Sequence, residues 1–243
     1  MIVLISGKPN TGKSTALGKI IDLLGPPRCS GLLTEEILKD GERIGFSTCG
    51  LKCRKRIILA HKDFDKTYAV EDFGVDLSSL EKLMIEELET GSNDERTRFL
   101  IIDEIGRMQV MSKRFRELLD QIADSSKTLI ASICYEDEIE YIRDFKKRDD
   151  VSLFVLNETN RNDLPTLLCK TICKDDQEYL GKLELAKKYA GMKELYEHYP
   201  DKTILHSTHG VRTITVNEGQ YQCTCDYYQK NGTCSHIMSL IIS

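Results

Sequence analysis

Residues 7–14 read Gly-Lys-Pro-Asn-Thr-Gly-Lys-Ser and match the phosphate-loop pattern G-x-x-x-x-G-K-[ST]. Gly7 and Gly12 have no side chains, so the backbone can wrap closely around a triphosphate with successive N–H groups pointing inward. In this pattern Lys13 reaches the β- and γ-phosphates, and the Ser14 hydroxyl binds Mg²⁺. The stretch therefore predicts a nucleoside triphosphate site made of Gly7, Lys8, Pro9, Asn10, Thr11, Gly12, Lys13 and Ser14.

The residues on either side of the loop favour the same interpretation. Residues 1–6 form an apolar, β-branched run that is typical of a buried parallel strand. Residues 15–24 repeat apolar side chains at helical spacing. Strand, loop and helix in this order form the structural context that the motif requires.

The composition sets limits on the class of protein. The 243 residues are 40% hydrophobic and 30% charged, and the net charge of −5 gives the whole chain no bulk attraction for nucleic acid or anionic membranes. No apolar run has the length of a membrane span, and the first residues lack the pattern of a signal peptide, so we expect a cytoplasmic protein. Nine cysteines without an export signal predict thiols or metal ligands instead of disulfides.

A second polar motif follows a buried run in the middle of the chain. Residues 99–102 are apolar and are followed directly by Asp103 and Glu104. In a parallel sheet the carboxyl end of such a strand faces the ligand crevice. We therefore expect Asp103 to hold Mg²⁺ and Glu104, just beyond the strand end, to polarise the attacking water.

The remaining periodicity predicts an α/β fold with a mainly parallel sheet covered on both faces. An Asp-Gly turn at residues 40–41 predicts a hairpin between strands at 31–37 and 44–49. Residues 91–96 are expected to be a polar linker. The other expected strands are 56–61, 128–134 and 151–156, and the expected helices are 77–88, 113–123, 136–145 and 162–173.

Four segments resemble the P-loop nucleoside-triphosphatase family of the cancer-related type, over roughly residues 1–174. They are Gly7–Ser14, the segment Gly31-Leu-Leu-Thr-Glu-Glu36 followed by Gly41-Glu-Arg-Ile-Gly-Phe46, Asp103-Glu-Ile-Gly-Arg-Met108 and Glu158-Thr-Asn-Arg161. The resemblance implies a RecA-like three-layer domain that hydrolyses several nucleoside triphosphates slowly with Mg²⁺. It also implies phosphate and magnesium contacts for Lys13 and Ser14, and a Walker-B role for Asp103 and Glu104.

Arg161 follows the family pattern in these segments, and Asn10 departs from it. Arg161 matches the family's late Asn-Arg pair, where an arginine can stabilise charge on the transferring phosphoryl group or merely pair at the start of a helix. Asn10 stands where the family often has glycine, which affects the expected backbone geometry of the loop.

The C-terminal part of the chain carries a metal-binding pattern. Residues 176–199 are expected to form a helix that connects two bodies, followed by strands at 204–207, 211–216 and 221–223 and a turn at 217–219. The sequence then reads Cys223-x-Cys225, eight residues, and Cys234-x-His236. Three thiolates and one imidazole make a complete tetrahedral shell for Zn²⁺, which would stabilise a module of this small size.

This pattern resembles the SWIM-type zinc finger, and the resemblance covers about residues 201–243. We expect a small ββα-like zinc module there. The predicted domains are therefore a P-loop NTPase domain at 1–174, a helical linker at 175–200 and the zinc module at 201–243.

Fingers of this type are assigned to DNA or protein partners. The module has balanced charge, which gives poor non-specific attraction for DNA, so a protein partner is slightly favoured. The charges are those of Lys202, Arg212 and Lys230 against Asp201, Glu218 and Asp226.

The sequence favours an Mg²⁺-dependent nucleoside-triphosphatase whose zinc finger binds a partner. Two alternatives stay open. A nucleotide or nucleoside kinase uses the same phosphate-binding loop for transfer to an acceptor. A nucleic-acid-binding switch would use the nucleotide only to change conformation.

Overall fold

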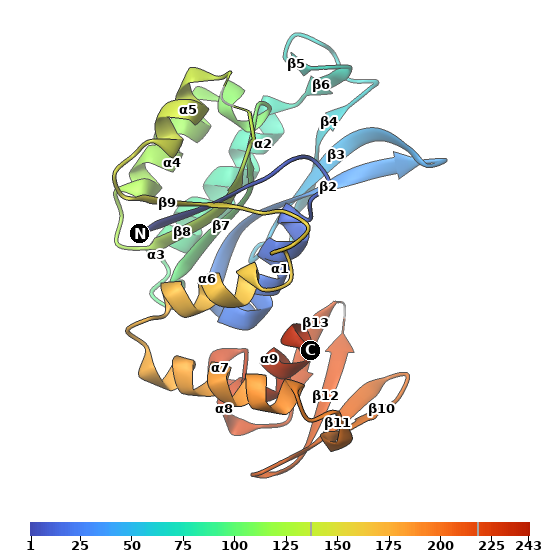
Figure 1. Cartoon of the computed structure of the whole chain (residues 1–243). Coiled ribbons are helices and arrows are strands. Elements are labelled where there is room, and N and C mark those ends of the chain that lie inside the picture. Colours follow the sequence, from blue (N-terminus) through green and yellow to red (C-terminus); the bar gives the residue numbers. More distant parts are fainter. Residues whose placement is uncertain (137, 218) are drawn as a thin grey trace. The chain divides into compact units, whose positions relative to one another are not determined.

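A computed structural model of the chain describes residues 1–136, 138–217 and 219–243. The chain forms two compact units (Figure 1). The first comprises Met1–Leu17 and Cys29–Glu158, and the second comprises Gly18–Arg28 and Thr159–Ser243. Helix α1 (Lys13–Leu24) supplies residues to both units, because its first five residues belong to the first and the rest to the second.

A nine-stranded sheet forms the centre of the first unit, with the strand order β5-β6-β4-β3-β2-β7-β8-β1-β9. Pairing is parallel from β2 through β7, β8 and β1 to β9, and antiparallel from β2 through β3, β4 and β6 to β5. The strands are β1 (Ile2–Ser6), β2 (Cys29–Lys39), β3 (Glu42–Gly50), β4 (Arg56–His61), β5 (Ala69–Val70), β6 (Phe73–Val75), β7 (Phe99–Ile105), β8 (Thr128–Ile133) and β9 (Val151–Val155).

The α/β class is therefore correct, while the sheet is mixed instead of mainly parallel. The parallel arrangement holds for the five strands around β1, and the hairpin of β2 and β3 extends the sheet with antiparallel strands. The Asp40-Gly41 turn of that hairpin is confirmed, and both turn residues have positive φ angles. Such angles match the twist of the flanking strands in a two-residue turn.

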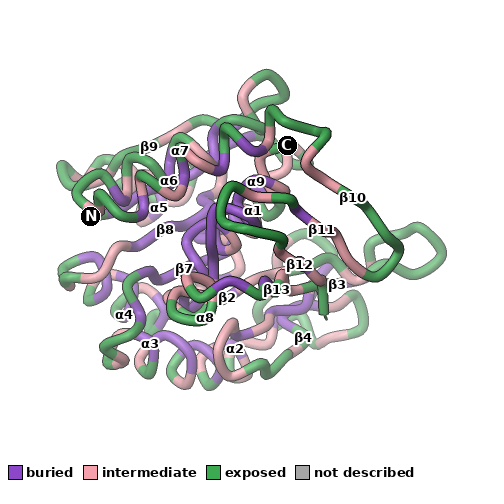
Figure 2. Tube along the Cα trace, turned by 90° about the horizontal axis from the view of Figure 1, so that it is seen from below, coloured by how far each residue is buried: buried purple, intermediate pink, exposed green. Residues whose placement is uncertain are grey.

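Helices cover one face of the sheet in the first unit (Figure 1). They are α2 (Leu77–Met84), α3 (Thr90–Asn93), α4 (Lys113–Ala123) and α5 (Glu140–Lys146). The apolar stripe of α4 places Phe115, Leu119 and Ile122 in one buried cluster with Leu4 of β1 and Ile102 of β7. This burial of apolar area holds the central strands in place, and Figure 2 shows β7 and β8 as buried.

Two predicted segments of the first unit differ from the structure. The helix expected at 77–88 is α2 followed by a π-helical turn at Ile85–Glu89, and helix α3 occupies part of the expected linker. The π turn places Glu87 inside the protein, where it accepts hydrogen bonds from Ser30 and three backbone amides. The helix expected at 136–145 begins at Glu140, and residue 137 lies outside the described residues.

The second unit combines helices with a four-stranded antiparallel sheet of order β10-β11-β12-β13. Its helices are α6 (Leu164–Ile172), α7 (Gln177–Ala190), α8 (Asp226–Asn231) and α9 (Ser235–Ile242). Its strands are β10 (Tyr196–His198), β11 (Lys202–Ser207), β12 (Gly210–Asn217) and β13 (Gln220–Cys223). The predicted turn at 217–219 includes residue 218, which lies outside the described residues.

Helix α7 is shorter than the sequence predicts. It ends at Ala190, and the residues that follow form a 3₁₀ turn (Lys193–Leu195) and strand β10, so the sheet has four strands where three were expected. Tyr189 of α7 lies in one buried cluster with Leu205, Ile214 and Ile237. A helix expected to connect two bodies therefore supplies core side chains to the second unit.

The end of α1 is held within the second unit by close contacts. The Tyr179 hydroxyl donates to the carbonyl oxygen of Leu23 at 3.3 Å. Gly232 ends α8 at a φ of 68°, and a Cβ at this position would lie 2.3 Å from Pro27 Cδ. Glycine is required there by both the left-handed backbone and the space.

None of the helices in the described ranges is long and apolar enough to cross a membrane.

Candidate nucleotide site and Cys/His cluster

The predicted phosphate loop connects β1 to α1 in the first unit. Gly7 is confined, because a Cβ there would lie 2.7 Å from the carbonyl oxygen of Leu156. Lys13 Nζ donates to the carbonyl oxygen of Gly7 at 3.1 Å, so its ammonium group is folded back over the loop. The N-terminus of α1 adds unpaired backbone N–H groups and a positive dipole end, and both attract a phosphate.

Asn10 adopts a left-handed backbone conformation, with φ at 63°. Asparagine tolerates this region better than other residues with a Cβ, and glycine has no penalty there. The structure thus gives a physical reason why Asn10 can occupy a position where glycine is frequent.

Asp103 lies on β7 with its side chain buried in the first unit. The Ser132 hydroxyl of β8 donates to Asp103 Oδ1. Oδ2 is also buried, and it has no hydrogen-bond partner among the residues that the structure describes. An unpartnered buried carboxylate oxygen is costly, so this atom is available to a cation.

Asp103 and Glu104 occupy an irregular part of β7. Ile102 pairs with Ala131 and Ile105 pairs with Ile133, so two residues of β7 lie opposite the single residue Ser132 of β8. This is a β-bulge, a feature that re-aims side chains next to functional sites. Glu104 therefore lies within the strand, and the expectation that it follows the strand end is wrong.

Glu104 faces Lys13, with Oε2 4.0 Å from Nζ. Its side chain keeps 35% of its surface exposed, so water can reach the carboxylate. Gly106 leaves the necessary space, because a Cβ there would lie 2.9 Å from Glu104 Oε1. The Asp-Glu-Ile-Gly motif thus combines the two carboxylates with a residue that does not crowd them.

Burial raises the pKa of both carboxyl groups above their ordinary values. For Asp103, the hydroxyl groups of Ser132 and Ser14 and the charge of Lys13 act in the opposite direction and lower the pKa. For Glu104, Lys13 again lowers the pKa, and the neighbouring Asp103 raises it. The site therefore brings together Lys13, Ser14, Asp103 and Glu104, as their sequence motifs suggest.

Ser132 is a polar residue that the sequence analysis did not single out. It lies in the apolar strand β8, is fully buried and contacts Asp103 directly. The available signal was a hydroxyl residue near the carboxyl end of a buried strand, where a parallel sheet presents its ligand-binding groups.

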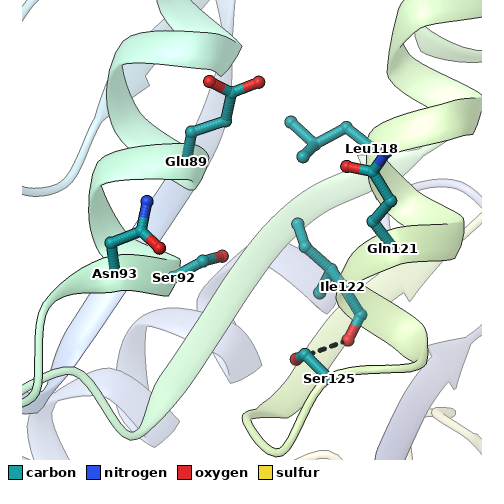
Figure 3. Close-up of a pocket in the computed structure, with 7 residues that line it drawn as sticks. All are labelled: Glu89, Ser92, Asn93, Leu118, Gln121, Ile122 and Ser125. Atoms are coloured by element: carbon teal, nitrogen blue, oxygen red, sulfur yellow. Dashed lines mark hydrogen bonds between the residues drawn. The ribbon is translucent and has the colours of Figure 1, made fainter.

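A pocket elsewhere in the first unit does not fit a triphosphate. It lies between the helical segments at Ile85–Asn93 and α4 (Figure 3). Its lining contains one carboxylate and no cationic side chain, whereas a triphosphate needs many donors or cations. The lining residues are Glu89, Ser92, Asn93, Leu118, Gln121, Ile122 and Ser125.

The second unit contains a group of four potential metal ligands, Cys223, Cys225, Cys234 and His236. One ligand atom from each lies within 4.8 Å of the others, and all four residues are buried. Cys223 ends β13, Cys225 caps α8, and the pair Cys234 and His236 begins α9. The His236 Nδ1 atom lies 3.7 Å from Cys223 Sγ.

The three thiols affect one another's ionisation. Hydrogen bonding from Cys223 and Cys234 lowers the pKa of Cys225, while hydrogen bonding with Cys225 raises the pKa of Cys223 to about 11. A divalent cation would let all three ionise, because coordination deprotonates thiols.

The basic residues at 52–56 and the predicted Arg161 have ordinary structural surroundings. In the basic run at residues 52–56, Lys52 pairs with Asp94, Lys55 with Glu86 and Arg56 with Glu35. These paired cations do not form a free basic patch. Arg161 is exposed in the turn before α6 in the second unit, and its catalytic role stays a prediction.

Comparisons with known proteins agree on one family. The family described as NTPase matches residues 2–169 of the chain. "Nucleoside-triphosphatase THEP1" of Thermotoga sp. (strain RQ2) is 38% identical over 164 residues, which cover 68% of this chain and 91% of that protein.

Solved structures show the same likeness. The crystal structure of THEP1 from the hyperthermophile Aquifex aeolicus has a TM-score of 0.62 and 32% identity, and the match covers 69% of this chain and 96% of that chain. The solution structure of a human cancer-related nucleoside triphosphatase has a TM-score of 0.60 and 27% identity, with 70% and 96% covered. The chain therefore belongs to the NTPase family of THEP1-type P-loop proteins, and it is a nucleoside-triphosphate hydrolase.

Proposed function

We propose that the chain hydrolyses ATP, GTP and other nucleoside triphosphates with Mg²⁺ at the loop formed by Gly7–Ser14. The observation that carries this proposal is the unpartnered Asp103 Oδ2, buried beside β8 in the part of the molecule that the structure describes. Together with the Ser14 hydroxyl it offers oxygen ligands, which Mg²⁺ prefers.

In this proposal each residue of the site has its own role in hydrolysis. The loop amides and Lys13 hold the phosphates and offset their charge. Ser14 and Asp103 would hold Mg²⁺, which neutralises charge on the β- and γ-phosphate oxygens when bound. Glu104 orients the attacking water, and its raised pKa makes the carboxylate a better proton acceptor than one in bulk water.

Phosphate release from ATP, GTP and CTP with a titration of Mg²⁺ tests this assignment. Glu104→Gln keeps the size of the side chain but removes the base, so we expect turnover to fall roughly 100-fold or more with little change in nucleotide affinity. The exposed Glu95→Gln is the matched control. Wild-type turnover in Glu104→Gln would contradict the role of Glu104.

We further propose that Cys223, Cys225, Cys234 and His236 hold a structural Zn²⁺ of the SWIM type. The donor set fits, because three thiolates and one imidazole fill a tetrahedral shell and leave no position for substrate. The His236 Nδ1 atom lies 3.7 Å from Cys223 Sγ, a separation that fits two ligands of one tetrahedral ion. Metal analysis of the purified protein should find about one zinc per chain, and a protein purified without chelators that contains none would contradict the assignment.

We also propose that the zinc module at residues 201–243 binds a protein partner. The balanced charge of residues 201–243 favours this over non-specific DNA binding, which depends on clustered cations. Binding to duplex and single-stranded DNA at low and moderate salt tests the alternative. Tight binding that weakens steeply with salt would favour nucleic acid instead.

A further inference from the structure

The strand order places one polar residue between the strand that leads into the phosphate loop and the strand that carries Asp103. Strand β8 lies between β1, which leads into the phosphate loop, and β7, which carries Asp103. Ser132 on β8 pairs in register with Ile5 of β1 and lies opposite the bulge of β7. Among the described residues of β8, Ser132 therefore lies beside β1 just before the phosphate loop and also beside the bulge with Asp103 and Glu104.

The Ser132 hydroxyl contacts one oxygen of Asp103 and leaves the other free. It donates to Oδ1, and both side chains are buried. A carboxylate held at one oxygen has its rotation about χ2 restricted, so the direction of Oδ2 is set as well. Within the described residues, Oδ2 has no other hydrogen bond that would orient it.

A second buried serine–carboxylate pair in the same unit shows what a purely structural arrangement looks like. Ser30 donates to Glu87 Oε1 at 2.7 Å, and backbone amides of Gly31, Lys52 and Cys53 supply the remaining hydrogen bonds to both Glu87 oxygens. Glu87 is thus satisfied by the protein itself. Asp103 is satisfied at one oxygen only, which is the arrangement expected when the other has a ligand.

We propose that Ser132 is a positioning residue that fixes the Asp103 carboxylate so that Oδ2 points toward the Mg²⁺ site beside Ser14. This inference rests on the proposed function, because it assumes that Asp103 holds the ion. Residues that hydrogen-bond a metal ligand set its orientation, and their loss typically lowers metal affinity about 10- to 100-fold.

The test measures binding of a fluorescent ATP analogue to the full chain over a range of Mg²⁺ concentrations and in EDTA. Ser132→Ala should raise the half-saturating Mg²⁺ concentration about tenfold. Affinity in EDTA should stay within twofold, because the loop amides and Lys13 hold the phosphates. Ser132→Thr keeps a hydroxyl and should recover most of the Mg²⁺ response, and Ser30→Ala should match the wild type.

The outcomes separate the inference from the function on which it rests. Unchanged Mg²⁺ dependence in Ser132→Ala, with altered dependence in Asp103→Asn, overturns the positioning role alone. Equal weakening of binding by Ser132→Ala with Mg²⁺ and in EDTA also overturns it, because that pattern indicates a structural role. If Asp103→Asn itself leaves the Mg²⁺ dependence unchanged, the proposed function fails and the inference falls with it.

Discussion

The nucleotide site and the Cys/His cluster differ in how many binding groups the protein itself satisfies. At the nucleotide site, Asp103 has one oxygen held by Ser132 and one without a partner among the described residues, and Glu104 remains partly exposed. At the cluster, four ligand atoms converge within 4.8 Å and are buried.

This difference fits the proposed division between a site for turnover and a site for stability. An incomplete set of ligands leaves room for a substrate and a water, as catalysis requires, whereas four protein ligands complete the shell of a structural metal. The extent of the family match agrees with this division, because it ends at residue 169, before the cluster. The following substitutions test the comparison.

The largest effect is expected from Lys13→Ala. We propose that Lys13 contacts the transferring phosphate, so removing this cation should lower kcat/KM for ATP roughly 100-fold or more. Zinc content and the melting temperature should hardly change, because Lys13 donates to the phosphate loop and is not a member of the Cys/His cluster. Phosphate release and thermal unfolding measure both, with Lys19→Ala on the same helix as the control. A large loss of stability in Lys13→Ala would argue against separate roles of the two sites in turnover and stability.

Cys234→Ser should produce the opposite pattern. Loss of one thiolate from a closed shell should release zinc and make residues 201–243 sensitive to protease, while turnover stays within about threefold of the wild type. Zinc release to a chromogenic chelator and limited proteolysis follow the change. Cys173→Ser removes a buried thiol of the same unit outside the cluster and should retain zinc. Abolished turnover in Cys234→Ser would show that the two sites are coupled.

Asn10 allows a smaller and more local test of the nucleotide site. Asn10→Gly should bind nucleotide as well as the wild type, because glycine adopts the φ of 63° without strain. Asn10→Val should weaken binding about tenfold, since a β-branched residue in this region costs about 1–2 kcal/mol. Titration with a fluorescent nucleotide compares the two. Equal affinities would mean that the loop changes conformation on binding.

The smallest expected effect concerns Asp22 of α1, in the second unit. Burial raises the pKa of Asp22 to about 6, so the folded chain binds this proton more tightly than the unfolded chain does. The contribution of Asp22 to stability therefore rises as the pH falls from about 6 to about 4, and its charge is destabilising at higher pH.

Asp22→Asn should remove this dependence. The variant should be more stable than the wild type at pH 8 by about 1–2 kcal/mol, allowing for partial exposure, and should gain nothing at pH 4. Urea unfolding at several pH values measures the difference, and the exposed Asp149→Asn is the control. A gain that is the same at every pH would argue against ionisation as the cause.

Local signals predicted much of this molecule. Glycine positions predicted the phosphate loop, turn chemistry predicted the Asp40-Gly41 hairpin, and an apolar run predicted the strand that leads to Asp103. Each of these signals is contained within a few residues. The clustering of the three cysteines and His236 also follows from their spacing. Family membership was predicted from the same short motifs, and the comparisons confirm it.

The sequence alone determined where the candidate phosphate-binding and metal-ligating groups lie along the chain, because their chemistry depends on near neighbours. Only the tertiary structure decided that Ser132 contacts Asp103 and that a bulge holds Glu104 within β7. The same is true of Tyr189 of α7, which packs in the hydrophobic core of the second unit. These arrangements join residues that are far apart in the sequence, 29 positions for Ser132 and Asp103, or depend on strand register. Strand register and packing are set by the burial of many side chains at once, which no local pattern records.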